Sequence, residues 1–399
     1  MNKSIFCALA FGSVNITTSN RYIPCCNAVH GPHTLKYTDR TTPGEPTERF
    51  NGSWMKDVRR ELKEGIWPIT CGLCKQAEQQ GGQSMRQIWN SELSKYSIPI
   101  VEVVDPADVK YMSAAFSNKC NSKCMTCSPV SSTLWAEEFK IIWPSNVVAT
   151  PVANTHSAAE LYKLFPNVEH VSLLGGEPTV MDEHDTFVKG FISTGQSANI
   201  QLTYVTNLTG ISDELISDWG HFKHVSIMAS IDGIGLTNDY IRYPVKWGKV
   251  ETNLRKLLLA SNRKLTIGLS CTASMFNCGD IADLFLYWHN ICKEYNNSES
   301  AYINIVVSPA YTACDILSDR YRFAVIDKLK KTKDILDSSP LCSSLSNLID
   351  KLVTVRASDQ TIINAKHFIS ESDKFRNRHI KDYLPEVWED LFNEKSILL

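Results

Sequence analysis

The chain lacks several features that mark out large classes of protein. No apolar run approaches the roughly 20 residues that a membrane-spanning helix needs, so we expect a soluble, cytoplasmic protein without a membrane partner. No long basic run occurs, and the net charge is −2 with a pI of about 6.6. This balance does not indicate a nucleic-acid partner. Internal repeats and low-complexity tracts are absent as well.

The N-terminal run MNKSIFCALAFGSV resembles a secretory signal only superficially. Its apolar part after Lys3 covers about five residues, whereas the core of a signal peptide needs roughly seven to fifteen. We therefore expect this segment to belong to the folded protein.

Cysteine, in contrast, is abundant and unevenly distributed. The 399 residues include 13 cysteines, and eight of these lie before residue 75 or in one triplet near residue 120. The odd total and the C-x2-C and C-x3-C-x2-C spacings favour metal ligation in a reducing compartment over a disulfide scaffold. The length is sufficient for one large domain or two smaller ones.

From about residue 105 to 315, apolar strand-like runs alternate with amphipathic helical stretches. The predicted strands are Tyr111–Ser117, Val168–Leu174, Ile200–Thr206, Lys223–Ile231, Leu265–Thr272 and Tyr302–Ser308. The predicted helices between them are Ser131–Ile142, Asp182–Phe191, Ile211–Trp219, Val250–Ala260 and Ile281–Tyr287. This alternation predicts an α/β fold with a parallel sheet, whose chemistry lies at the carboxyl ends of the strands.

Two flanking segments have a different character. Residues 1–104 are rich in turns and cysteine, with short β-like pieces at Ser13–Thr17 and Arg21–Pro24 and a helix at Trp54–Glu64. This composition predicts a small domain held together by a metal cluster. Residues 316–399 are predicted to be a helical extension and carry no chemical motif.

Cys120, Cys124 and Cys127, in the run FSNKCNSKCMTCSP, carry the strongest chemical signal. The C-x3-C-x2-C spacing lets one loop ligate three irons of a 4Fe–4S cluster and leaves the fourth iron open to a small molecule. A structural zinc site is the alternative. Such a site usually needs four ligands, and no fourth ligand follows locally.

The triplet and the run VSLLGGEPTV, one predicted strand later, resemble motifs of the radical S-adenosylmethionine (SAM) superfamily. The resemblance implies a partial (βα)6 TIM-like barrel. It also implies that SAM binds the open iron and is cleaved to methionine and a 5′-deoxyadenosyl radical. In that family the motif matched by Gly175, Gly176 and Glu177 holds the amino group of SAM; an ordinary βα turn is the alternative for these residues.

The same resemblance suggests further contacts with SAM at later strand ends. Thr206 and Asn207 end the third predicted strand, and Ser230 and Asp232 end the fourth. Their hydroxyl, amide and carboxylate groups suit the ribose hydroxyls, although Asp-Gly also marks any tight turn.

Two more residues complete the expected SAM site, and one departs from the family pattern. Arg242 matches an arginine near the SAM carboxylate, with an ordinary surface arginine as the alternative, and Ser270 lies on a strand where the family contacts SAM. The residue before the third cysteine is often aromatic in the family but is Thr126 here, so the adenine contact in this loop is expected to differ.

Upstream cysteines resemble a twitch, or half-SPASM, module that holds an auxiliary iron–sulfur cluster. The ligands implied for an auxiliary 4Fe–4S cluster are Cys7, Cys25, Cys71 and Cys74, with Cys26 as a neighbour or alternative. A zinc site built from the same four remains open. Such modules usually follow the radical SAM core, whereas here the cysteines precede it.

These motifs together predict a radical SAM enzyme that abstracts hydrogen from a peptide or protein side chain. A small molecule or nucleotide is the alternative substrate, and a non-enzymatic metal-binding or electron-transfer protein is the alternative from another class. A flavodoxin- or ferredoxin-type protein is the expected electron donor. No general acid or base can be identified from the sequence.

Overall fold

A computed structural model describes residues 5–18, 21–28, 46–145, 158–353 and 356–393. The chain forms two compact units, each assembled from several segments. Unit 1 comprises residues 1–118, 152–203 and 217–225, and unit 2 comprises residues 119–151, 204–216 and 226–399.

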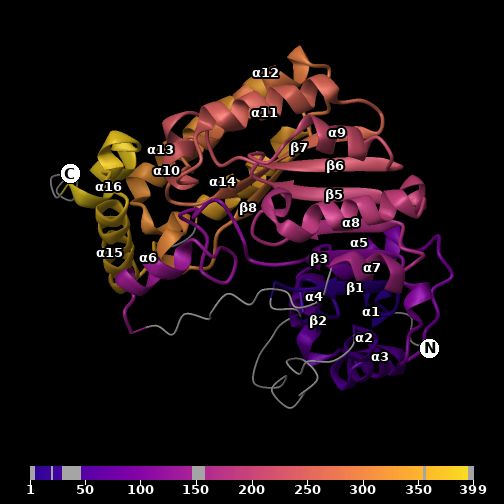
Figure 1. Ribbon diagram of the computed structural model, residues 1–399. Helices are drawn as coiled ribbons and strands as arrows, with labels where there is room; N and C mark the ends of the chain where they lie inside the picture. Colours follow the sequence, from indigo (N-terminus) through magenta and orange to yellow (C-terminus); the bar gives the residue numbers. More distant parts are fainter. Residues whose placement is uncertain (1–4, 19–20, 29–45, 146–157, 354–355, 394–399) are drawn as a thin grey trace. The chain divides into compact units, whose positions relative to one another are not determined.

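The strands follow one another in the hydrogen-bonded order β2-β1-β3-β4-β5-β6-β7-β8 (Figure 1). Their bounds are β1 Ser13–Ile16, β2 Tyr22–Ile23, β3 Tyr111–Ala115, β4 His170–Leu174, β5 Gln201–Thr206, β6 His224–Ser230, β7 Leu265–Ala273 and β8 Ala301–Ile305. The pairs β1–β3, β3–β4 and β7–β8 are parallel, and β1–β2 is antiparallel. The six strands predicted from residue 105 onward overlap β3 to β8.

The sheet also contains two N-terminal strands that the sequence had suggested for a separate small domain. Strand β1 pairs in parallel with β3, with Ser13 opposite Tyr111 and Ile16 opposite Ala114. All four residues of β1 are buried, as expected of a strand covered on both faces. The cysteine-rich N-terminus therefore shares a sheet with the first strand of the predicted core. Domain boundaries at residues 104 and 315 remain predictions.

The helices of unit 1 are short, and several were not predicted. They are α1 Ala8–Gly12, α2 Pro46–Phe50, α3 Ser53–Glu64, α4 Gly72–Gln79, α5 Met85–Glu92, α7 Ala158–Leu164 and α8 Asp182–Ser193. Helix α5 begins with a capping box, in which the Ser84 side chain accepts from the Gln87 N–H and the Gln87 side chain accepts from the Ser84 N–H.

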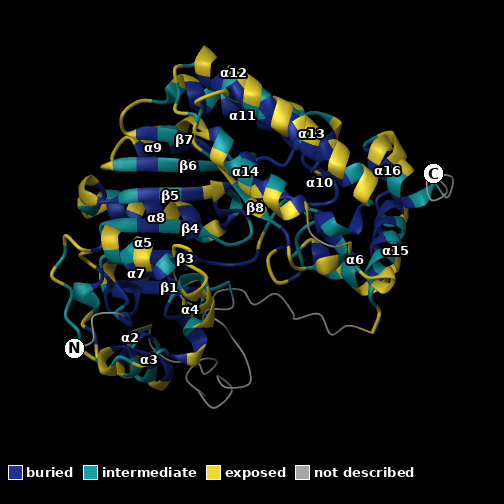
Figure 2. Cartoon of the chain, turned by 180° about the vertical axis from the view of Figure 1, so that it is seen from behind, coloured by how far each residue is buried: buried dark blue, intermediate teal, exposed yellow. Residues whose placement is uncertain are grey.

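Helices of unit 2 include the longest in the described part of the chain. They are α6 Trp135–Ile142, α10 Leu236–Ile241, α11 Trp247–Ala260, α12 Ile281–Glu294, α13 Asp319–Leu336, α14 Leu341–Leu352, α15 Asp359–Phe375 and α16 Pro385–Phe392. Helix α9, Asp213–Trp219, runs across the boundary between the units. Helix α13 buries a stripe that includes Val325, Ile326 and Leu329 and exposes its other side (Figure 2).

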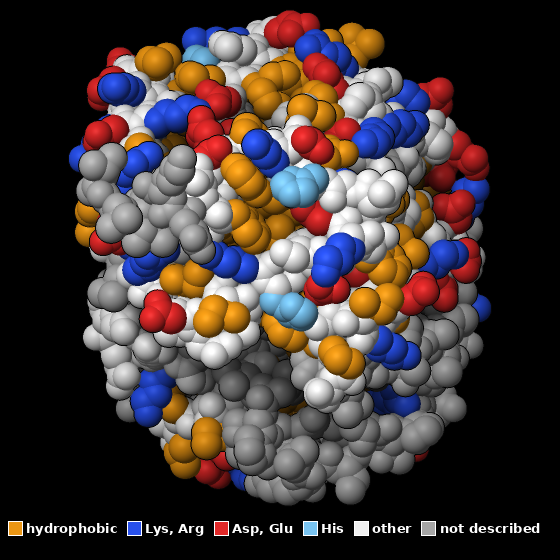
Figure 3. Space-filling model, turned by 90° about the vertical axis from the view of Figure 1, so that its left-hand side faces the viewer, with side chains coloured by type: hydrophobic (Ala, Val, Ile, Leu, Met, Phe, Trp, Pro, Cys, Tyr) orange, Lys and Arg blue, Asp and Glu red, His pale blue; other side chains and the backbone are white. Residues whose placement is uncertain are grey.

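The charge distribution on the surface and the character of the helices bear on the predictions about nucleic-acid and membrane partners. Acidic and basic side chains are interspersed over the face shown in Figure 3. Among the described residues, no helix combines the length and the apolar character needed to cross a lipid bilayer.

A buried arginine joins the helices of unit 1. The Arg59 side chain donates to the carbonyl oxygens of Ala10 at 2.8 Å, Glu102 at 3.1 Å and Phe50 at 3.3 Å, and to Asn51 Oδ1 at 2.7 Å. Residue Arg59 is fully buried, and desolvation lowers its pKa to about 10. The guanidinium of Arg59, on α3, thus provides a hydrogen-bond donor to a carbonyl oxygen of α1.

We expect Arg59→Met to lower the free energy of unfolding by about 3–5 kcal/mol, because it strands several buried acceptors. Arg60→Met is the matched control, since Arg60 pairs with Asp57 at the surface. Denaturant unfolding of the full chain measures both. Equal, small effects of the two substitutions would contradict this role for Arg59.

Candidate functional site

The three cysteines of the triplet lie on the loop between β3 and α6, in unit 2. Ser122 connects the first two: its Oγ lies 3.3 Å from Cys120 Sγ and 3.5 Å from Cys124 Sγ. The Ser122 N–H also points to Cys120 Sγ at 3.4 Å, and the Ser122 carbonyl accepts from Ser132 Oγ at 2.6 Å. Two of the predicted ligand sulfurs therefore lie within reach of one hydroxyl.

The third thiol lies in the same electrostatic environment. Burial, followed by the nearby Cys124 thiol, raises the pKa of Cys127 to about 12. Cys120 acts in the same direction, while Arg242 opposes it. Thiols within electrostatic range of one another resist ionising together unless a cation compensates the charge. A thiolate donor set of this kind fits an iron–sulfur cluster.

Backbone hydrogen bonds hold the cysteine loop against the segment that follows α10. The Lys123 N–H donates to the Tyr243 carbonyl at 2.7 Å, and the Met125 N–H donates to the Ile241 carbonyl at 2.8 Å. On the other side, the indole N–H of Trp135 donates to the Cys124 carbonyl at 3.0 Å. The loop conformation is thus supported on both flanks of Cys124.

The end of β5 supports the same loop. Asn207 donates from Nδ2 to Asn121 Oδ1 at 2.8 Å, and its own Oδ1 accepts from the N–H and hydroxyl of Thr209. Asn121 in turn donates to Thr209 Oγ1 at 2.6 Å. Thr206 Oγ1 accepts from the Leu208 N–H at 3.1 Å. Asn207 therefore fixes the loop between Cys120 and Cys124, and its predicted contact with ribose stays a prediction.

Asp232 and Arg242 form a buried ion pair, with Arg242 Nη2 2.8 Å from Asp232 Oδ2. Asp232 Oδ1 accepts from the Thr272 N–H at 2.8 Å. Burial opposes the charge of Arg242, but the adjacent Asp232 carboxylate raises the pKa of the guanidinium above its ordinary value. Arg242 also lies within electrostatic range of Cys124 and Cys127. It is therefore a buried residue of this site and not a surface arginine.

Asn238, which lies between Asp232 and Arg242 in the sequence, was not among the predicted site residues. Asn238, on α10, is fully buried, and neither polar atom of its amide has a hydrogen-bond partner among the described residues. The Nε of Arg242 is likewise without a hydrogen-bond partner in the described structure. Unpartnered buried polar atoms are rare in folded proteins and are explained when a ligand or ordered water satisfies them. Asn238 lies four residues before Arg242 in the run NDYIRYP, but its residue type alone gave no signal.

Ser230 and Ser270 lie on the neighbouring strands β6 and β7. Both are half-buried, and the Ile231 N–H donates to the Ser270 carbonyl at 3.1 Å. Among the described residues, neither hydroxyl has a hydrogen-bond partner. Both hydroxyls therefore retain their capacity to bind a polar ligand.

The Gly-Gly-Glu turn belongs to unit 1. Gly175 has φ 125°, and a β-carbon there would lie 2.7 Å from the Ser117 carbonyl oxygen, so only glycine fits. The Gly176 N–H donates to the same carbonyl at 3.1 Å. Glu177 is buried and accepts through Oε1 from the N–H and hydroxyl of Thr179 at 3.1 and 2.7 Å. The hydrogen bonds from Thr179 therefore fix the orientation of the Glu177 carboxylate within the turn.

The N-terminal cysteines lie within unit 1, and several pairs of them are within electrostatic range of each other. Burial raises the pKa of Cys7 to about 11, and the nearby Cys74 adds to the effect. Burial, followed by Cys7 and Cys74, raises the pKa of Cys71 to about 12. Cys25 lies within electrostatic range of Cys7, Cys71 and the exposed Cys26, and its pKa is also raised, mainly by burial. Each of the four predicted ligands is thus within electrostatic range of at least one of the others, and their role as ligands stays a prediction.

Arg86 is a second residue that the sequence analysis missed. It forms a two-point ion pair with Glu78, at 2.9 and 2.6 Å, and donates to the Phe6 carbonyl at 2.6 Å. Burial raises the pKa of both Cys7 and Cys71, and the positive charge of Arg86 offsets a small part of that rise. A buried cation beside thiols favours their ionised, metal-binding form.

Within the described ranges, no group of three or more His, Cys, Asp or Glu side chains is arranged to hold a metal ion as the chain stands. The fit of both cysteine sets to metal clusters therefore rests on the thiol donor chemistry and the electrostatic proximity given above.

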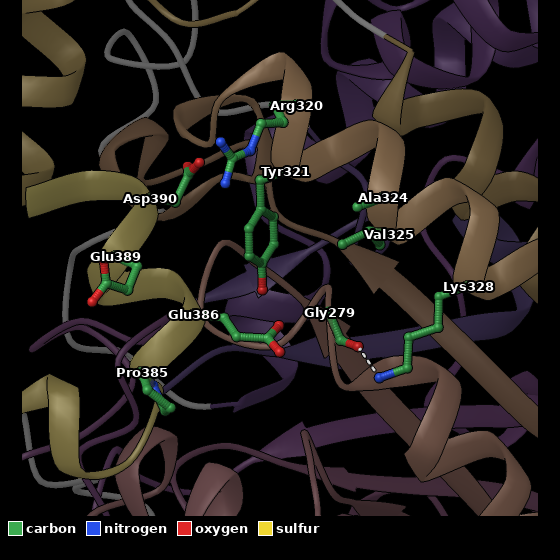
Figure 4. A pocket seen from close by; sticks show the side chains of 10 residues that line it. All are labelled: Gly279, Arg320, Tyr321, Ala324, Val325, Lys328, Pro385, Glu386, Glu389 and Asp390. Carbon is green, nitrogen blue, oxygen red and sulfur yellow. Dashed lines mark hydrogen bonds between the residues drawn. The ribbon is translucent and has the colours of Figure 1, made fainter. Parts of the chain in front are cut away.

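A cavity of about 510 Å³ lies elsewhere in unit 2 (Figure 4). It is lined by α13, α16 and Gly279, whose carbonyl accepts from Lys328 Nζ at 2.9 Å. The Tyr321 ring extends into the space between these elements, toward Glu386. None of the predicted site residues lines this cavity.

No protein-family model matches the chain, and no curated protein does. Solved structures similar to it include anSMEcpe with bound S-adenosylmethionine, at 16% identity and a TM-score of 0.41, covering 57% of this chain and 59% of that one. Streptococcus suis SuiB bound to S-adenosylmethionine has 15% identity and a TM-score of 0.39, covering 86% and 73%. TYW1 with a lysine-pyruvate adduct has 15% identity and a TM-score of 0.31, covering 58% and 72%.

We expect Asp232→Ala and Arg242→Met each to lower the free energy of unfolding by about 3–5 kcal/mol, because each leaves a buried charge unpaired. The double substitution should cost clearly less than the sum, since neither charge remains. Denaturant unfolding of the four proteins gives the coupling. Strictly additive costs would show that the two groups do not act as a pair.

Proposed function

We propose that the chain is a radical SAM enzyme that binds a 4Fe–4S cluster through Cys120, Cys124 and Cys127. The observation that carries the proposal is that Cys120 and Cys124 both lie beside Ser122 Oγ on one supported loop, and that Cys124 and Cys127 lie within electrostatic range of the buried Arg242. Such a cluster, when held by these residues, would supply the reducing electron needed to cleave SAM and so to abstract hydrogen from a substrate.

The residues of the chain would bind and orient SAM. Arg242, held by Asp232, presents a fixed cation suited to the SAM carboxylate. The Asn238 amide and the hydroxyls of Ser230 and Ser270 supply donors and acceptors for other polar groups of SAM. Gly175, Gly176 and Glu177 are proposed, from the motif alone, to receive the amino group.

We also propose that Cys7, Cys25, Cys71 and Cys74 hold an auxiliary 4Fe–4S cluster. Support comes from their mutual electrostatic proximity and from the Arg86 cation beside two of them. A peptide or protein side chain remains the proposed substrate, and a flavodoxin- or ferredoxin-type protein the proposed electron donor. Both proposals derive from the family resemblance of the cysteine motifs.

Anaerobic reconstitution tests the proposed function. We expect the wild-type chain to bind about eight irons and, with dithionite and SAM, to release 5′-deoxyadenosine. Replacing Cys120, Cys124 and Cys127 by Ala should remove about half of the iron and all of the product. Cys71→Ala with Cys74→Ala should remove the other half.

Cys342→Ala is the matched control for these variants, because Cys342 lies on α14 outside both sets. The radical SAM assignment is overturned if reconstituted wild-type protein releases no 5′-deoxyadenosine. Zinc in place of iron at the loop would support the non-enzymatic alternative.

Asn238→Leu separates ligand binding from stability. Because the buried amide is unpartnered, we expect the substitution to leave the unfolding free energy of the ligand-free chain unchanged or slightly higher. The affinity for SAM should fall about tenfold, as expected for the loss of one or two buried hydrogen bonds. Calorimetry with SAM and thermal unfolding without it measure the two effects. A large loss of stability with unchanged affinity would contradict a binding role for Asn238.

A further inference from the structure

Helix α15 ends in a tight turn in which Arg376 precedes Asn377 and Arg378 follows it. The Asn377 N–H donates to the Lys374 carbonyl at 3.2 Å, and the Arg378 N–H donates to the Asp373 carbonyl at 3.0 Å. Asn377 has φ 48°, a left-handed conformation that Asn tolerates better than most residues. This Schellman-type ending sets the positions of Arg376 and Arg378.

Arg376 connects α15 to both α6 and the cysteine loop, all within unit 2. Its Nε lies 2.8 Å from Glu138 Oε1, with both side chains fully buried, and its Nη2 donates to the Lys123 carbonyl at 2.9 Å. The guanidinium lies 4.7 Å from the centre of the Trp135 ring, whose N–H donates to the Cys124 carbonyl. One side chain thus reaches the loop both directly and through Trp135.

Arg378 holds the end of α10, just before Arg242. Its Nη1 donates to the Tyr240 carbonyl at 2.8 Å, and its guanidinium lies 3.9 Å over the Tyr240 ring. The Tyr240 hydroxyl donates to Asp373 Oδ1 at 3.0 Å. Both arginines also point to the sulfur of the buried Met125, at 3.2 Å for Arg376 and 3.4 Å for Arg378.

The two arginines therefore contact the two segments that hydrogen-bond to each other at the site. The loop N–H groups of Lys123 and Met125 donate to the carbonyls of Tyr243 and Ile241. Burying two cations is costly unless each is paired and hydrogen-bonded. The cysteine loop, α6 and α10 provide the hydrogen-bond acceptors named above, and Asp373 on α15 itself is the carboxylate that pairs with Arg378, at 3.6 Å.

We propose that Arg376 and Arg378 are positioning residues that hold the cysteine loop and the Arg242 segment in the arrangement that binds the cluster. This inference rests on the proposed function, since the cluster is what the loop would hold. The arginines act through the backbone and through Trp135, without touching the cluster. The C-terminal extension, which carries no sequence motif, thereby becomes part of the site.

The first test uses the metal-free full chain and amide hydrogen exchange. Arg376→Met should speed exchange across residues 120–127 about tenfold, because the loop loses a buried anchor. Arg255→Met is the matched control, since Arg255 pairs with Glu251 and Glu294 at the surface. Unchanged exchange in the loop would overturn the inference.

The second test uses the reconstituted chain. Arg376→Met should weaken iron retention at the loop roughly 10- to 100-fold, as substitutions around metal ligands commonly do, with partial recovery in Arg376→Lys. Arg376→Met and Glu138→Gln should shift the potential of the cluster in opposite directions, because one removes a positive and the other a negative charge. Normal iron retention with unshifted potentials would overturn the inference, even if loop exchange rises.

Asn377 offers a test that leaves both arginines in place. Asn377→Val strains the left-handed position and should reproduce the faster loop exchange, whereas Asn377→Gly should behave as wild type. If both variants behave as wild type, the turn does not position the loop. Should the wild-type chain bind no iron while Arg376→Met still loosens the metal-free loop, the proposed function fails and the anchoring by Arg376 stands.

Discussion

The arrangement of the site depends on carrying three thiols on one short, partly buried loop. Like-charged sulfurs repel when ionised, and burial further disfavours their ionisation, as the raised pKa of Cys127 reflects. A loop under this constraint needs external support. It receives that support from Asn207, from the carbonyls of Ile241 and Tyr243, and from Trp135.

The same constraint gives a reason for the cations nearby. Arg242 lies within electrostatic range of Cys124 and Cys127, and Arg86 occupies a comparable position beside Cys7 and Cys71. Each is itself held by a carboxylate, Asp232 in one case and Glu78 in the other. A cation fixed beside thiols lowers the cost of forming thiolates, which metal binding requires.

Much of the fold could be predicted because periodicity and strand-end motifs are local signals. Strands β3 to β8 overlap their predicted ranges, and the triplet falls directly after β3 as expected. The pairing of β1 with β3 could not be predicted, because nearly 100 residues separate the two strands and a fully buried four-residue run does not reveal its partner.

At the site, residue types were easier to predict than pairings. Asp232 and Arg242 were selected separately for SAM, but their mutual ion pair depends on tertiary structure. Asn238 went unselected because a lone amide carries no spacing signal. Arg376 and Arg378 went unselected for a similar reason: their partners Glu138 and Tyr240 lie more than 100 residues away along the chain.

The central claim is that the loop carries a cluster with one iron open to SAM. The most direct measurement is the EPR spectrum of the reduced loop cluster in a chain whose Cys71 and Cys74 have been replaced, recorded before and after SAM is added. A change in the spectrum that depends on SAM is the predicted result, because SAM would bind the cluster itself. An iron-loaded loop whose spectrum is identical with and without SAM would contradict the account.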